Sequence, residues 1–179
     1  MPAGLSSVLD KIEYTSSATV TLAFDGSVRR ALPPGFGFLV PRSEGKRLLA
    51  ATFVHNKFPH RAPDDRALFR CFLGGARDPS ILDQADAEIL RIVRQELQQI
   101  LGLTAEPLFT RVYKWKSAMA QYNVGHFERI DNIERACHEL PNLALAGNAY
   151  HGIGIPDCVR SGTDAVARVL RTLGLQEPE

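Results

Sequence analysis

The chain has 179 residues and a formal net charge of +1 at pH 7, and 45% of its residues are hydrophobic and 23% charged. This composition is typical of a globular protein of one or two domains, and the charge balance gives no case for nucleic-acid binding. No apolar run approaches the roughly 20 residues that a transmembrane helix needs.

The cysteines and histidines give no sign of a disulfide framework or a metal site. Cys71, Cys137 and Cys158 are widely spaced and odd in number, which predicts reduced thiols in a reducing compartment. The five histidines do not combine with them at metal-ligand spacings. The N-terminal region lacks the basic and apolar segments of a secretory signal. The sequence therefore predicts a cytoplasmic location and no metal.

The first half of the chain has strand character. Val20, Leu22 and Phe24 alternate with small or hydroxylated residues, a period of two that predicts a strand with one buried face. Further strands are predicted in GFGFLVP (35–41), RLLAATFV (47–54) and ALFRCFLGG (67–75). Turn residues separate these segments, which favours an antiparallel meander with one face covered.

A long helix is predicted from about Ala85 to Leu101. Its apolar residues recur at helical spacing, acidic residues crowd its first turn, and Gly102 follows its last residue. The segment EPLFTRVYKW then returns to strand character. This helix is expected to cover the sheet.

The remainder of the chain predicts a shorter helix over 125–139, a brief apolar strand from Leu143 to Ala146, and a last helix from near Pro156 to about Leu173. A proline in the first helical turn is tolerated because its missing N–H has no intrahelical acceptor. The fold class is therefore α+β: a mostly antiparallel sheet covered by a long helix, followed by a strand-loop-helix.

Closely spaced glycines precede the last helix. Gly147, Gly152 and Gly154 would let the backbone approach a ligand, and free N–H groups at a helix start favour a phosphate or the electron-rich edge of a ring such as flavin. Short glycine patterns are weak signals, however, and spacing alone favours an ordinary strand-to-helix turn.

The whole stretch AGNAYHGIGIPDCVRSG resembles the C-terminal flavin-contacting signature of protoporphyrinogen oxidases. These are oxygen-dependent FAD enzymes of haem biosynthesis within the amine-oxidase-like flavoprotein superfamily. The segments GFGFLVP, FPHRAP with the later LGG, and KWKSAMAQYNVGH resemble other motifs of that family in the same order. The resemblance runs from about Leu5 to about Leu175, and several motifs at matching intervals make it specific.

The resemblance also implies which part of the family's fold is represented. Family members carry an N-terminal dinucleotide-binding unit with a GxGxxG loop, and this sequence contains no such segment. Residues 1–125 would correspond to the C-terminal half of a substrate-binding domain and residues 126–179 to the end of an FAD-binding domain. FAD is then expected to bind this chain weakly or not at all without a partner, either the missing N-terminal segment or a second copy.

The resemblance further implies two sets of site residues. Those expected at FAD are Trp115, Gly147, Asn148, Gly152, Ile153, Gly154 and Ile155. Those expected at the substrate are Phe36, Gly37, Leu39 and Phe72. Without the family, Trp115 and the substrate set would also suit plain packing in the core. No catalytic general base is expected, because hydride would pass to the flavin while an apolar cavity orients the substrate.

The implied activity of the parent protein is FAD-dependent oxidation of protoporphyrinogen IX or coproporphyrinogen III to the porphyrin, with oxygen as the acceptor. One alternative is a non-catalytic fragment or split subunit that completes a flavin site with a partner. Another is a different enzyme of the superfamily, such as an amine oxidase, although GFGFLVP and RAP with LGG argue against it. Peripheral membrane association is an alternative to a purely cytoplasmic location.

Overall fold

The computed structural model describes residues 4–140 and 142–175, which fall into two compact units. One unit contains residues 15–118, and the other joins the residues before 15 to those after 118. The sequence places the change of domain at residue 125 instead. The assignment of one part to a substrate-binding domain and the other to an FAD-binding domain stays a prediction.

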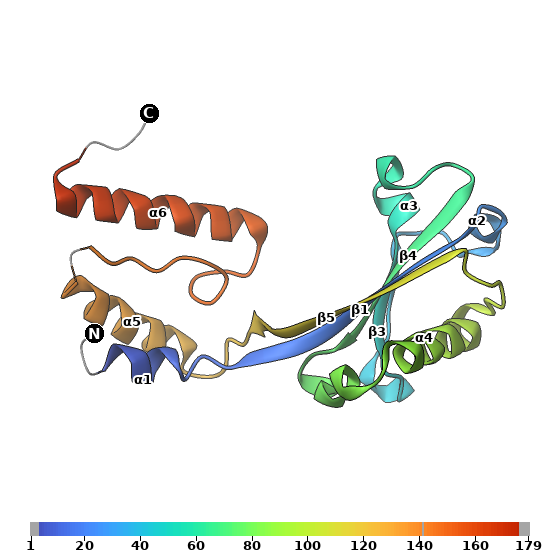
Figure 1. Cartoon of the computed structure of the whole chain (residues 1–179), viewed down its shortest axis with the longest axis horizontal. Helices are drawn as coiled ribbons and strands as arrows, with labels where there is room; N and C mark the ends of the chain where they lie inside the picture. Colours follow the sequence, from blue (N-terminus) through green and yellow to red (C-terminus); the bar gives the residue numbers. More distant parts are fainter. Residues whose placement is uncertain (1–3, 141, 176–179) are drawn as a thin grey trace. The chain divides into compact units, whose positions relative to one another are not determined.

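The larger unit is built on a five-stranded sheet (Figure 1). Its strands are β1 (Tyr14–Asp25), β2 (Gly37–Leu39), β3 (Leu48–Phe53), β4 (Arg66–Gly74) and β5 (Phe109–Ala120). In the order β2-β3-β4-β1-β5, the segment β2 to β4 forms the antiparallel meander that the sequence predicts. The first strand lies beyond β4, antiparallel to it, and separates it from β5.

Helix α4 (Asp86–Leu101) covers one face of this sheet (Figure 1). Ile89, Val93 and Leu97 are buried against the alternating residues of β1 and β4, in one core with Val20 and Phe69. Burial of such side chains contributes roughly 1.5–3 kcal/mol each. Gly102 ends the helix in the left-handed conformation, with φ of 68°, as the sequence predicts. The period-two and helical patterns are thus both confirmed.

Polar contacts tie α4 to the start of β3. The Glu96 carboxylate accepts the backbone N–H groups of Arg47 at 3.0 Å and Leu48 at 2.8 Å. Arg47 Nε also donates to Asp78 at 2.6 Å, and this hydrogen bond is the main reason why the pKa of Asp78 lies below its ordinary value. Backbone donors at the end of the strand are therefore satisfied by the helix that covers it.

The smaller unit contains α1 (Leu5–Leu9), α5 (His126–His138) and α6 (Ile155–Leu173). Its small core gathers residues from distant parts of the chain: Leu5, Ile12, Ala120, Ile130, Ile133, Cys137 and Ala149. The two longer helices confirm the predicted ones to within about a residue. The short α1 and its packing on α5 are not predicted by the sequence.

The predicted strand from Leu143 to Ala146 is wrong, because the described residues 142–146 adopt neither strand nor helix. A strand exists only when a neighbour supplies its ladder of hydrogen bonds. No described segment of the chain pairs with these residues, so the apolar run is left without a ladder.

Short elements complete the larger unit. They are the helices α2 (Ser27–Ala31) and α3 (Val54–Lys57) and the 3₁₀ turns Arg42–Glu44, Pro59–Arg61, Gly75–Arg77 and Pro79–Asp83. In the described part of the chain, no helix has the length and hydropathy to span a membrane. Cys71, Cys137 and Cys158 are free thiols.

Candidate functional site

The sheet face opposite α4 carries three of the predicted site residues in one row. Leu39 lies opposite Ala50, Ala50 lies opposite Phe72, and Phe72 lies opposite Thr19. Trp115 Nε1 extends the row by donating a hydrogen bond of 3.1 Å to Thr19 Oγ1. Leu39 is 82% exposed and Trp115 is 50% exposed. The three residues between them are half-buried, so the row is a largely apolar surface that is open at its two ends.

Gly37 and Phe36 lie at the edge of the same sheet. Gly37 pairs with Thr52 and has φ of 139°, and a Cβ added to it would lie 2.0 Å from the carbonyl oxygen of Ala51. Strand pairing by itself therefore requires glycine at this position. The Phe36 side chain is 65% exposed, while its carbonyl accepts the Phe53 N–H at 2.8 Å.

The predicted cofactor loop, 147–155, lies in the smaller unit and leads into α6. A Cβ on Gly152 would lie 2.7 Å from the Asp157 carboxyl group, and one on Gly154 would lie 2.9 Å from it. The two glycines thus make room for a side chain in the first turn of the helix. Ile153 and Ile155 beside them are 69% and 81% exposed.

Two residues that the sequence analysis did not assign to the site hold this loop in shape. The Tyr122 hydroxyl donates to the Asn148 carbonyl at 3.0 Å and accepts the Gly152 N–H at 2.9 Å. Its ring stacks on that of His126, with centroids 3.9 Å apart and 13° between the planes. His126 Nε2 in turn donates to the Tyr150 carbonyl at 3.0 Å. Three hydrogen bonds between this aromatic pair and the loop, two donated by the pair and one accepted by it, therefore fix the middle of the loop.

The sequence signal for this pair is the segment QYNVGH, which places Tyr122 and His126 four residues apart. Gly125, with φ of 82°, precedes His126 at the start of α5, and His126 is buried. Spacing alone gives this segment no role beyond the family resemblance, because its contacts join residues more than twenty positions apart. A further contact, from the Gly147 N–H to Ser161 Oγ at 3.2 Å, ties the loop to α6.

The predicted cofactor residues divide between the two units. Trp115 belongs to the sheet unit, whereas Gly147, Asn148, Gly152, Ile153, Gly154 and Ile155 belong to the helical unit. The four substrate residues, Phe36, Gly37, Leu39 and Phe72, all belong to the sheet unit.

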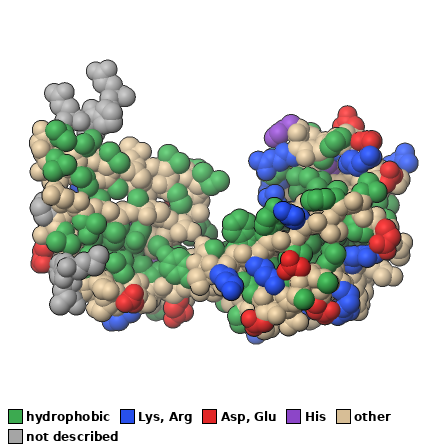
Figure 2. Space-filling model, in the orientation of Figure 1, with side chains coloured by type: hydrophobic (Ala, Val, Ile, Leu, Met, Phe, Trp, Pro, Cys, Tyr) green, Lys and Arg blue, Asp and Glu red, His purple; other side chains and the backbone are tan. Residues whose placement is uncertain are grey.

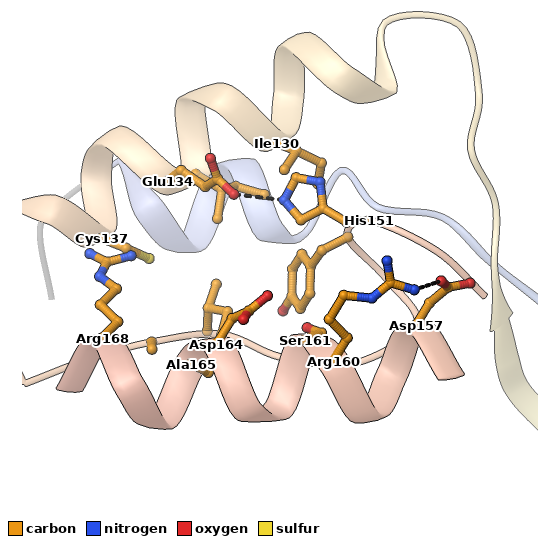
Figure 3. Close-up of a pocket in the computed structure, with 14 residues that line it drawn as sticks. Ile130, Glu134, Cys137, His151, Asp157, Arg160, Ser161, Asp164, Ala165 and Arg168 are labelled. Carbon is orange, nitrogen blue, oxygen red and sulfur yellow. Dashed lines mark hydrogen bonds and ion pairs between the residues drawn. The ribbon is translucent and has the colours of Figure 1, made fainter. Parts of the chain in front are cut away.

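A cavity of about 360 Å³ lies between α5 and α6 in the smaller unit (Figure 3). Glu134 pairs with His151 at 2.6 Å on one side, and Asp157 pairs with Arg160 at 2.8 Å on the other. None of the predicted cofactor residues lines this cavity. Acidic and basic side chains both line the cavity, and two pairs of them are in contact with each other.

The opposite side of α6 is apolar and uncovered. Ile155, Val159, Val166 and Leu173 are between 51% and 81% exposed, and hydrophobic side chains reach the surface along this helix in Figure 2. By contrast, its polar residues, such as Ser161, line the cavity. Amphipathic helices normally bury the apolar stripe, so the described part of the chain leaves the packing of α6 incomplete.

Burial favours the neutral forms of four ionisable groups. Burial raises the pKa of the Cys71 and Cys137 thiols and of the Tyr150 hydroxyl, and it lowers the pKa of His55. Thiols with a raised pKa are poor nucleophiles. In the described ranges, no group of three histidine, cysteine, aspartate or glutamate side chains is arranged to hold a metal.

Comparison with known proteins places the chain in a family. Residues 1–170 match the flavin containing amine oxidoreductase family. The chain is 36% identical over 167 residues to the coproporphyrinogen III oxidase of Bacillus subtilis, covering 92% of this chain and 35% of that protein. It is 30% identical over 169 residues to protoporphyrinogen oxidase 2 of Arabidopsis thaliana, covering 92% and 33%.

Solved structures agree with the sequence matches. The crystal structure of a protein assigned as a protoporphyrinogen oxidase from Exiguobacterium has a TM-score of 0.81 at 32% identity, covering 95% of this chain and 37% of that one. Reduced UDP-galactopyranose mutase is similar in fold alone, with a TM-score of 0.70 at 12% identity. The chain spans about a third of the length of these relatives. It belongs to the flavin containing amine oxidoreductase family.

Proposed function

We propose that this chain forms the C-terminal part of an FAD-dependent porphyrinogen oxidase. In this proposal the loop 147–155 faces the flavin, and the open sheet face lines the substrate cavity. The row of Leu39, Phe72 and Trp115 carries the proposal, because it lies on the sheet face opposite α4, with Leu39 and Trp115 exposed and Phe72 half-buried. The relatives named for coproporphyrinogen and protoporphyrinogen oxidation support it.

The residues of the loop fit one edge of a flavin ring. Free N–H groups at the start of α6 would face the electron-rich edge of the ring, and the helix dipole would favour charge there. Tyr122 and His126 fix the loop before any ligand binds, so little conformational entropy remains to be lost. When bound, FAD would supply the hydride acceptor.

The residues of the sheet face fit a flat apolar substrate. Leu39 and Phe72 present aliphatic and aromatic surface, and Trp115 is held in one orientation by Thr19. Such a surface would orient the macrocycle and exclude water. The proposal includes both coproporphyrinogen and protoporphyrinogen as substrates, because the relatives are named for both.

The test is complementation of this chain by the part of a relative that it does not span. The chain would be purified alone and after co-expression with the N-terminal two thirds of the Bacillus subtilis relative. We expect flavin absorbance and porphyrin formation from coproporphyrinogen III only in the co-expressed sample. A Phe72→Ala variant should lower the rate, whereas Arg91→Gln, on the exposed side of α4, should not.

Three results would contradict parts of the proposal. The requirement for a partner would be refuted by a chain that retains flavin and oxidises a porphyrinogen alone. The substrate class would be refuted by a complemented, yellow protein that oxidises amines and no porphyrinogen. A complemented protein that binds flavin but has no oxidase activity would favour the alternative of a non-catalytic subunit.

A further inference from the structure

The open face of the sheet carries a cation that no described residue neutralises. Arg70 lies between Thr52 on β3 and Thr21 on β1. Its neighbours along β4, Phe69 and Cys71, are buried in the core below α4. Because side chains alternate along a strand, the exposed Arg70 side chain projects from the opposite face.

Of the four other basic residues on these strands, two have polar or acidic partners, whereas Arg111 faces the Tyr113 ring and Lys116 has no ion pair in the described part of the chain. Arg66 pairs with Asp65, and Lys114 reaches the Gln84 carbonyl and Asp86 on the side of α4. The five strands contain a single acidic residue, Asp25, at the far end of β1. No hydrogen bond or ion pair joins Arg70 to the described part of the chain.

Arg70 is also next to the apolar row. It precedes Phe72 by two residues on the same face, a separation of about 7 Å along the strand. Rows of paired residues place Gly37, Thr52, Arg70 and Thr21 directly beside the row that contains Phe72. A flat apolar ligand covering the Phe72 row would therefore have its edge at the Arg70 guanidinium.

We propose that Arg70 binds a peripheral carboxylate of the flat macrocyclic substrate that lies on this row. The proposal rests on the proposed function and deepens it, because it names a specificity-determining residue for anionic substituents of the macrocycle. A guanidinium offers a planar pair of donors that matches a carboxylate, and it is less strongly hydrated than an ammonium group. Arg111, on β5, has an aromatic neighbour in Tyr113, with 5.7 Å between guanidinium and ring.

Trp115 provides a direct probe of this surface. It is the only tryptophan of the chain, it lies in the Phe72 row, and half of it is exposed. The whole chain would be titrated with coproporphyrin III, which has four carboxylates, and with its tetramethyl ester, while Trp115 emission is followed. Neither measurement needs bound flavin or enzymatic turnover.

We expect the acid to quench Trp115 at a lower concentration than the ester. Arg70→Gln should weaken binding of the acid about tenfold, as expected for loss of a hydrogen bond between charged groups, and leave binding of the ester unchanged. Arg70→Lys should recover part of the loss. The matched control Arg91→Gln, at an exposed arginine of α4 paired with Glu88, should change neither titration.

The possible failures separate the two proposals. Equal quenching by acid and ester, with no effect of Arg70→Gln, would overturn the role of Arg70 and leave the sheet face as a macrocycle surface. Absence of quenching by either porphyrin would overturn both the role of Arg70 and the assignment of the row to the substrate. Circular dichroism of each variant would show that the fold is kept.

Discussion

The Tyr122 hydroxyl has two partners at once in the loop 147–155, which makes it the most informative single group for testing how that loop is held. It donates to the Asn148 carbonyl and accepts from the Gly152 N–H. Tyr122→Phe removes both hydrogen bonds but keeps the ring that stacks on His126. We expect a loss of about 1–3 kcal/mol in the free energy of unfolding, measured in urea.

The matched control for this change is Tyr113→Phe. Tyr113 is exposed on β5, and its ring lies beside the Trp115 ring and the Arg111 guanidinium. The same loss of a hydroxyl should therefore be nearly neutral there. Equal effects of the two substitutions would contradict the role given to Tyr122. In the complemented protein, Tyr122→Phe should also reduce the flavin that is retained.

Gly37 illustrates a residue fixed by backbone geometry. In Gly37→Ala the new Cβ would lie 2.0 Å from the Ala51 carbonyl oxygen, and the backbone would keep φ near 139°. Forced crowding of this kind costs roughly 1–3 kcal/mol, with a strained backbone adding to it. Gly45→Ala, at φ of 62° with open space around it, is the control and should cost only about 1–2 kcal/mol. Thermal unfolding of both variants would show whether Gly37 is the more sensitive.

The environment of Asp78 predicts how the free energy of unfolding depends on pH under acidic conditions. Its pKa is lowered in the folded state, chiefly by the hydrogen bond from Arg47, from an ordinary value of 3.8. The unfolded chain then binds the proton more readily, so this stabilisation is present above pH 3.8 and is lost as the pH falls through the folded value. In the Asp78→Asn variant, we expect the free energy of unfolding to fall less steeply as the pH drops below about 5, measured by urea unfolding at several pH values. An unchanged pH profile would contradict this assignment.

At the scale of elements, one carboxylate of α4 accepts hydrogen bonds from the backbone at the start of β3. Glu96→Gln retains one acceptor oxygen for the N–H groups of Arg47 and Leu48 but removes the charge. We expect a loss of about 1 kcal/mol in unfolding free energy. Glu88→Gln is the matched control, because Glu88 pairs with Arg91 of the same helix in an exposed position, where such pairs contribute little. A larger loss for Glu88→Gln would show that α4 is held in another way.

Helix α6 shows how far an element can be predicted. Its bounds follow from its sequence, because proline, glycine and helical periodicity mark both ends. Its surroundings do not follow, since the polar side lines a cavity and the apolar side is uncovered. The run 143–146 shows the same limit, because its apolar composition fits a strand but the described chain offers it no partner.

For the whole molecule, the uncovered side of α6 predicts association. Without an N-terminal partner, the chain should form oligomers that bury Val159 and Val166. The double substitution Val159→Glu and Val166→Glu should shift it to monomer in sedimentation velocity, with helix content unchanged. Arg160→Glu, at the cavity on the other side of the helix, is the control and should leave the oligomers intact. A monomeric unmodified chain would contradict this prediction.

The sequence predicts the five strands of the sheet and the three longer helices, because the period of hydrophobic residues encodes which side of each element is buried. It predicts neither the short helix α1 nor the irregular conformation of residues 143–146. It also carried the motifs of the family, including the residues expected at flavin and substrate. Only the tertiary structure decided that β1 lies between β4 and β5, which aligns Phe72 with Thr19 and Trp115. It likewise brought Tyr122 to Asn148 and Gly152. Such contacts join residues far apart in the chain, and they depend on how complete elements pair and pack, which no local pattern records.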